Sequence, residues 1–204
     1  MPSGFQDQVK FYEKKYSFTI SVCGFVIAFS GCVGNNTPAA NGTNSDNPKA
    51  NVISGEDAAG ISKIKNMSAG FEYVGNISLS TDVIKNNYNA ENVSGILGGS
   101  EGLYKGSNNS DFYIDVIQFE NKEAANNFIS TYKSSFKPLK EGSRFAEESF
   151  NGHSAVRITD YVTDAGKSVP RYSYIWNNEN YVLVASGSTV DNSLVRQLAE
   201  ATGY

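Results

Sequence analysis

An apolar segment near the N-terminus constrains this chain more than any other feature. Residues 17–32 read SFTISVCGFVIAFSGC, and Lys10, Lys14 and Lys15 precede them. The stretch that follows is polar and has no positive charge before Lys49. A basic flank, a short apolar region and small residues, in that order, are typical of a secretory signal. The apolar run of about 15 residues is shorter than the roughly 20 that a membrane-spanning helix needs, so a processed signal is favoured over a permanent span.

The end of this segment contains a lipoprotein-like motif. Residues 29–32 read FSGC, and they resemble a lipobox, in which small residues precede a cysteine that becomes lipidated and N-terminal. The flanks and the polar spacer resemble those of uncharacterised surface lipoproteins of methanogenic archaea. The resemblance implies a thioether-linked lipid on Cys32, and the alternative is an uncleaved signal anchor. Both interpretations place the rest of the chain on the outer face of the cell membrane, because positive residues stay on the cytoplasmic side.

Residues 33–60 lack apolar periodicity and are rich in Asn, Gly, Ala, Ser, Thr and Pro. A segment of this composition cannot build a core. We therefore expect a flexible tether between the signal or anchor segment, residues 1–32, and a single domain, residues 61–204. A coil of about 28 residues would hold that domain on the order of 30 Å from the bilayer.

Charge and cysteine content exclude several classes of function. The formal net charge is -4, and Lys and Arg are not clustered after residue 32, so nucleic acid is not expected as a partner. Both cysteines, Cys23 and Cys32, lie in the apolar segment. The predicted domain therefore has no internal disulfide, no cysteine nucleophile and no thiolate metal site, and its core alone must stabilise it.

The pattern after residue 60 predicts an α+β domain. Residues 71–80 and 111–119 have strand character, and the glycine-rich residues 93–106 between them predict a turn-rich hairpin or loop. Asn121 caps a predicted helix that ends before Pro138. The apolar residues on one face of this helix are Ala125, Phe128, Ile129, Tyr132 and Phe136.

Two hairpins and a closing helix complete the predicted domain. Asn151-Gly152 is the pair best suited to a type I′ turn, and a second hairpin turns over residues 177–180. Asp191 caps the closing helix, whose buried stripe is Leu194, Val195 and Leu198. This order predicts an antiparallel sheet of about five to seven strands with helices packed on one face. A ferredoxin-like and a PsbP-like arrangement fit equally well.

The predicted domain contains no set of residues that identifies a reaction. With one histidine, His153, which we expect to be solvated after the turn, neither a zinc site nor a Ser-His-Asp triad is supported. The glycine-rich segment lacks Walker spacing, and Asp160 and Asp164 lack the spacing of a calcium loop. Glu147 and Glu148 are adjacent and point to opposite faces of a strand. We predict no catalytic residue, no metal site and no cofactor.

Three aromatic residues form the one suggestive pattern. Tyr172, Tyr174 and Trp176 alternate along a predicted strand and so share a face, which Tyr113 and Tyr161 can join from neighbouring strands. Rings with polar tips suit the binding of sugars, apolar groups or a partner surface. The alternative is that this face packs beneath the helices.

Six Asn-x-Ser/Thr triplets permit N-glycosylation of an exported chain. Chance alone predicts about four such triplets in a chain with this Asn, Ser and Thr content, so the excess is small. The acceptor residues are Asn35, Asn41, Asn66, Asn76, Asn92 and Asn108.

Together these patterns predict a surface-tethered binding or interaction module without catalytic activity. The lipid supplies location, the tether supplies reach, and the sheet supplies a docking surface for a protein or a small molecule. One alternative is an accessory subunit of a larger membrane complex. Another is an extracytoplasmic enzyme that uses carboxylates alone, which requires two acids converging in a pocket.

Intact mass spectrometry of membrane-extracted protein tests the anchor. If Cys32 is processed as the resemblance implies, the mature chain begins at Cys32 and its mass exceeds that of residues 32–204 by the mass of a lipid. An unmodified chain that retains residues 1–31 would instead establish an uncleaved anchor.

Overall fold

The computed structural model describes residues 50–67 and 69–204. The predicted signal segment with Cys32 and the predicted tether up to residue 49 lie outside the described residues. Within those two ranges, no helix has the length and apolar character needed to cross a membrane.

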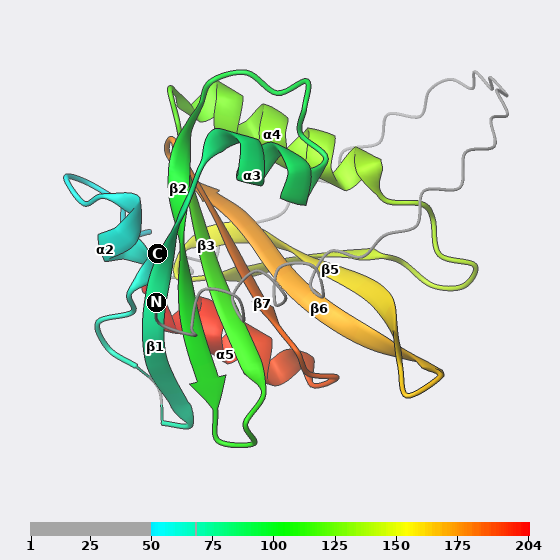
Figure 1. Ribbon diagram of the computed structural model, residues 1–204. Helices are drawn as coiled ribbons and strands as arrows, with labels where there is room; N and C mark the ends of the chain where they lie inside the picture. The colour runs from blue at the N-terminus through cyan, green and yellow to red at the C-terminus, as the bar shows by residue number, and fades with distance from the viewer. Residues whose placement is uncertain (1–49, 68) are drawn as a thin grey trace, which may run out of the picture. The chain divides into compact units, whose positions relative to one another are not determined.

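The described part of the chain forms four helices and seven strands, drawn in Figure 1. In chain order they are α2 (Ala58–Ser62), β1 (Phe71–Leu79), α3 (Thr81–Tyr88), β2 (Ile96–Gly106), β3 (Asp111–Phe119), α4 (Lys122–Ser135), β4 (Phe145–Phe150), β5 (His153–Asp164), β6 (Lys167–Asn178), β7 (Tyr181–Gly187) and α5 (Asn192–Ala201).

All seven strands belong to one antiparallel sheet in the order β1-β2-β3-β7-β6-β5-β4. Strands β1 to β3 form one meander, and β4 to β7 form another that runs back toward it from the opposite edge. α4 connects the two meanders, and the pairing of β3 with β7 joins them at the centre. The predicted α+β class and the antiparallel sheet are confirmed.

The helices pack on both faces of this sheet, so the predicted one-face arrangement is wrong. On β3, Phe112, Ile114 and Val116 belong to one buried cluster, whereas Ile117 and Phe119 belong to another. Because neighbouring residues of a strand point to opposite faces, the two clusters lie on opposite faces of the sheet. α2 and α5 pack on the first cluster, and α3 and α4 pack on the second (Figure 1).

Local sequence signals account for several of these elements. The Asn121 side chain accepts a hydrogen bond from the Ala124 backbone and caps α4, as predicted. The predicted apolar face of α4 is confirmed, because all five residues belong to the second cluster or pack against it. Asn151 and Gly152 have φ angles of 51° and 78° and join β4 to β5, which confirms the predicted turn.

The glycine-rich segment was predicted as a hairpin or loop, but residues 96–106 form strand β2. Here glycine is needed for close packing rather than for turning. A Cβ atom at Gly102 would lie 2.2 Å from the backbone oxygen of Ser62, so α2 reaches the sheet only because residue 102 has no side chain.

The folded domain also includes residues that the composition placed in the tether. Ile53 is buried in the first cluster with Ile61 and Ile64. Its backbone nitrogen donates a hydrogen bond to the Asn178 side chain, 3.1 Å away, at the end of β6. Residues 51–60 are therefore attached to the sheet despite their polar composition.

Phe128 provides a test of the second cluster. It is fully buried beside Phe119 and Tyr88, so Phe128→Ala should lower the free energy of unfolding by about 3–5 kcal/mol. The neighbouring Asn127 is exposed on the same helix. Asn127→Ala should change the free energy of unfolding by less than about 0.5 kcal/mol in the same urea titration, and equal effects of the two substitutions would contradict this packing.

Candidate functional site

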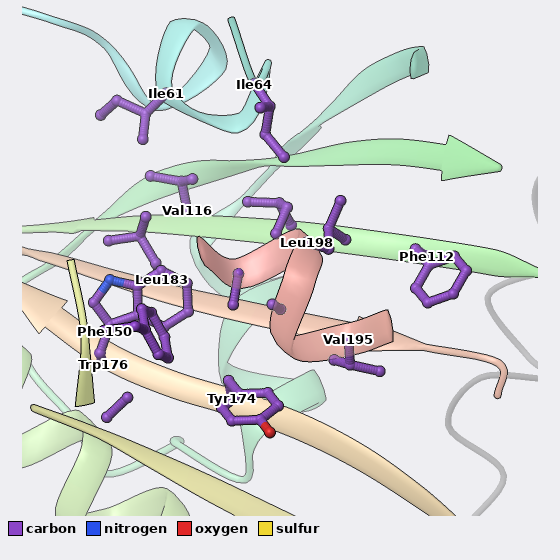
Figure 2. Close-up of a cluster of buried hydrophobic side chains, with 14 of the residues drawn as sticks. Ile61, Ile64, Phe112, Val116, Phe150, Tyr174, Trp176, Leu183, Val195 and Leu198 are labelled. Atoms are coloured by element: carbon purple, nitrogen blue, oxygen red, sulfur yellow. The ribbon is translucent and has the colours of Figure 1, made fainter. Parts of the chain in front are cut away.

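The predicted aromatic face lies in the core of the domain. Tyr174 and Trp176 are 0% and 1% exposed, and Tyr172 is partly buried against the same cluster. Figure 2 shows Tyr174 beside α5, with Val195 and Leu198 nearby, and Trp176 beside Phe150. The three residues do share a face, but α5 covers the inner two. Tyr174 and Trp176 therefore offer no accessible surface to a ligand.

Of the two tyrosines expected to join this face, Tyr161 does and Tyr113 does not. Tyr113 alternates with Phe112 on β3 and so points to the opposite face of the sheet. Tyr161 lies on the same face as Tyr172 but beyond the part of the sheet that α5 covers, and it is 50% exposed.

A group of charged residues lies at the edge of the aromatic face, beside Tyr172. Glu148 accepts hydrogen bonds from Arg157, at 2.8 Å, and from Arg196, at 2.7 Å. The Arg157 guanidinium also lies over the Tyr172 ring, 5.7 Å from its centroid. Arg196 also pairs with Glu200, at 2.7 Å, so the two arginines and the two glutamates neutralise one another and leave no unpaired positive charge for an anionic ligand.

The buried tyrosine hydroxyls differ in how they are satisfied. The Tyr104 hydroxyl donates to the backbone oxygen of Ser62 and accepts from the backbone nitrogen of Ile64, which ties the segment after α2 to the sheet. The Tyr174 hydroxyl and the Trp176 indole nitrogen have no hydrogen-bond partner among the described residues. Burial raises the pKa of Tyr104 to about 12 and that of Tyr174 to about 12, with Glu148 contributing to the second.

Two acids that the sequence analysis did not single out face each other across β2 and β3. Glu101 and Asp115 are directly opposite in register and are 2% and 3% exposed. The Tyr88 hydroxyl of α3 donates a hydrogen bond to Asp115. The two acids share a face of the sheet, but their burial leaves no exposed surface for a substrate to reach.

Two hollows in the surface of the described domain are lined by other residues than these acids. The larger, of about 340 Å³, lies between residues 51–66 and residues 201–204. Lys65 and Glu56 line it and form an ion pair of 2.6 Å, and the hydrogen bond from Lys65 lowers the pKa of Glu56. The smaller hollow, of about 100 Å³, lies beside the β2–β3 turn.

His153, Asp160 and Asp164, which were considered above as possible site residues, each have a hydrogen-bond or ion-pair partner within the domain. The His153 ring is partly buried, with Nε2 3.2 Å from the backbone oxygen of Asn51, so it is not the solvated residue that was expected. Asp160 pairs with Arg144, and Asp164 pairs with Arg171. No group of three or more His, Cys, Asp or Glu side chains in residues 50–67 and 69–204 could hold a metal ion.

Strands β5 and β6 extend beyond the rest of the sheet. β4 pairs with β5 only as far as Ile158, and β7 pairs with β6 only from Ser173. In the sheet ladder, residues 160–171 therefore pair only with one another, and Figure 1 shows this hairpin projecting at one side of the sheet, yellow to orange. We call residues 160–171 the ribbon.

The ribbon presents apolar side chains on an exposed two-stranded element. Residues 161–168 are all exposed. Tyr161 and Val162 are 50% and 39% exposed, and because they are adjacent they point to opposite faces of the ribbon. The turn at its tip contains Ala165 and Gly166, with φ angles of 48° and 77°. Within the described chain, the ribbon thus combines open backbone edges with exposed apolar side chains.

No protein-family model matches this sequence, and comparison with curated proteins found no significant match. Comparison with solved structures also found no significant match.

The two buried tyrosines give a matched pair of substitutions. Tyr104→Phe leaves the Ile64 nitrogen without its acceptor, so it should lower the free energy of unfolding by about 1–3 kcal/mol. Tyr174→Phe removes a hydroxyl that has no hydrogen-bond partner among the described residues, so the free energy of unfolding should be unchanged or higher. A large loss in the second variant alone would contradict this description.

Alkaline titration tests the same burial. The pKa of both hydroxyls is raised from 10.0 to about 12, so the folded state disfavours the tyrosinate form. The resulting stabilisation is fully present below about pH 10 and is lost as the pH rises toward about 12. Absorbance of tyrosinate should therefore rise together with unfolding for these residues, whereas half-ionisation of Tyr104 and Tyr174 near pH 10 in a folded chain would be inconsistent with their burial.

Proposed function

We propose that this chain is a membrane-tethered extracytoplasmic binding or interaction module without catalytic activity, and that the ribbon is its docking element. The signal-like residues 17–32 and the lipobox-like Cys32 support the location. The observation that carries the docking role is the projection of residues 160–171 beyond a sheet whose two faces are packed against helices.

The geometry of the ribbon favours a partner with an extended polypeptide segment. Exposed strand edges carry unpaired backbone N–H and C=O groups, which can bind an added strand by main-chain hydrogen bonds. Exposed side chains beside the edge then select the partner. Tyr161 combines an apolar ring with a polar hydroxyl, and this combination is enriched where proteins bind one another.

Features at the ribbon restrict indiscriminate edge pairing. Arg144 donates hydrogen bonds to the Thr159 backbone oxygen and to Asp160, so it covers the edge of β5 where the ribbon begins. Pro170 has no backbone N–H to donate, and Lys167 places a charge beside the tip. Proline and charge are devices that protect edge strands from aggregation, so the remaining open backbone suits a specific partner.

Of the two predicted arrangements, we favour a PsbP-like sandwich over a ferredoxin-like fold. A ferredoxin-like domain is built from split βαβ units, and the predicted version had its helices on one face. A seven-stranded antiparallel sheet between two helical layers fits a sandwich better.

The docking role predicts that changes at the ribbon reduce partner binding without affecting the fold. The double substitution Tyr161→Ser and Val162→Ser should lower recovery of the partner about tenfold or more, because exposed aromatic and apolar anchors dominate protein interfaces. The melting temperature should be unchanged, since both side chains are exposed. The measurement is quantitative mass spectrometry of proteins cross-linked to the full chain in its own membranes.

Val190 supplies the control, because it is 57% exposed and lies outside the ribbon. Val190→Ser should leave partner recovery at the original level. Equal recovery from the ribbon variant and the control would reject the ribbon as the docking element. A partner recovered in fixed stoichiometry with other membrane proteins would support the accessory-subunit form of the proposal.

A further inference from the structure

The acceptor triplets for N-glycosylation differ in how the structure holds them. Four of the six asparagines lie in the described residues, and all four are exposed: Asn66, Asn76, Asn92 and Asn108. Exposure alone does not separate them, but local conformation separates Asn108 from Asn76 and Asn92, and the triplet of Asn66 includes residue 68, which lies outside the described residues. We propose that Asn108 is an N-glycosylation site, an inference that rests on the extracytoplasmic location proposed above.

Asn108 lies in the turn that joins β2 to β3, where residues 107–109 are all exposed. Its Oδ1 atom accepts a hydrogen bond from the backbone nitrogen of Ser110, at 3.0 Å, which is an Asx-turn. This bond fixes the carboxamide and leaves its Nδ2 atom without a hydrogen-bond acceptor among the described residues. The turn thus presents the reactive nitrogen at the surface, two residues before the partly buried Ser110.

The triplets of Asn76 and Asn92 are held less favourably. Asn76 lies within β1, paired with Gly102, and its Nδ2 atom is directed to the Ser100 hydroxyl at 3.5 Å. In the triplet that begins at Asn92, the middle residue Val93 is buried in the second cluster, which anchors the backbone there. A transferase can therefore bind the turn at Asn108 without displacing a strand or a core residue.

The chemistry requires a donor from the export membrane. The co-reactant is an oligosaccharide whose anomeric carbon is bonded to a polyprenyl phosphate or diphosphate. The Asn108 Nδ2 atom attacks that carbon, a C–N bond forms, and the bond from the carbon to the phosphate oxygen breaks. The phosphate leaves with the electron pair, and the amide loses one proton to a base of the transferase.

The position of Asn108 is compatible with docking at the ribbon. All six triplets lie before residue 111, and none of the asparagines after that residue begins one. In the sheet, β3 and β7 separate β2 from β6, so a glycan on the β2–β3 turn belongs to the half of the domain that does not contain the ribbon. The turn and the ribbon extend beyond the same end of the sheet, with β3 and β7 between them.

Peptide mapping by mass spectrometry of the full chain from its native membranes tests this site. The peptide that contains Asn108 should carry a glycan, and the peptide that contains Asn76 should be unmodified. Asn108→Asp keeps an oxygen that can accept from Ser110 but removes the nucleophilic nitrogen, so it should lose one glycan mass with an unchanged melting temperature. Ser110→Ala should lose the same mass, whereas Ser110→Thr should retain it.

Protease treatment of intact cells separates the failure of this inference from the failure of the proposed function. If the domain is digested from outside and Asn108 is bare, the glycosylation site is rejected and the proposed location stands. If the domain is protected inside the cell and Asn108 is bare, both are rejected. Retention of the glycan mass in Ser110→Ala would also overturn the assignment of Asn108.

Discussion

The antiparallel pairing of β3 with β7 is the interaction on which the rest of the domain depends. Residues Phe112–Gln118 pair in continuous register with residues Tyr181–Gly187, and among the described strands this is the pairing that joins the two meanders of the sheet. Both strands are buried on both faces, so a shift of one residue would move the side chains of each cluster to the opposite face. The register of this pair therefore fixes which helices cover which face.

Coverage of both faces decides where function can lie. α5 covers Tyr174 and Trp176, and α3 contributes the hydroxyl that meets Asp115, so the aromatic face and the acid pair both belong to the interior. What extends beyond this sandwich is the hairpin of β5 and β6. The described part of the domain thus combines a packed sheet with the projecting ribbon on which the proposed docking role rests.

Local signals in the sequence predicted much of the fold, and long-range packing explains the rest. Asn151-Gly152 and the apolar face of α4 were predictable because each depends on residues close in the chain. Strand β2 was not predictable, because the need for glycine at residue 102 comes from close packing against Ser62, which belongs to a distant segment of the chain. The burial of Trp176 could not be predicted either, since periodicity shows that residues share a face of a strand but not which helix covers that face. Glu101 and Asp115 meet only through the β2–β3 register.

Hydrogen exchange of the full chain, purified and then in its native membranes, tests the central claim most directly. In the purified chain, amides of β3 and β7 should exchange only with global unfolding, whereas amides of residues 160–171 should exchange much earlier, because few buried contacts hold them. In native membranes, exchange of the ribbon should slow while that of β4 stays unchanged. A ribbon whose exchange is the same in both states, or that is as protected as β3 in the purified chain, would contradict this account.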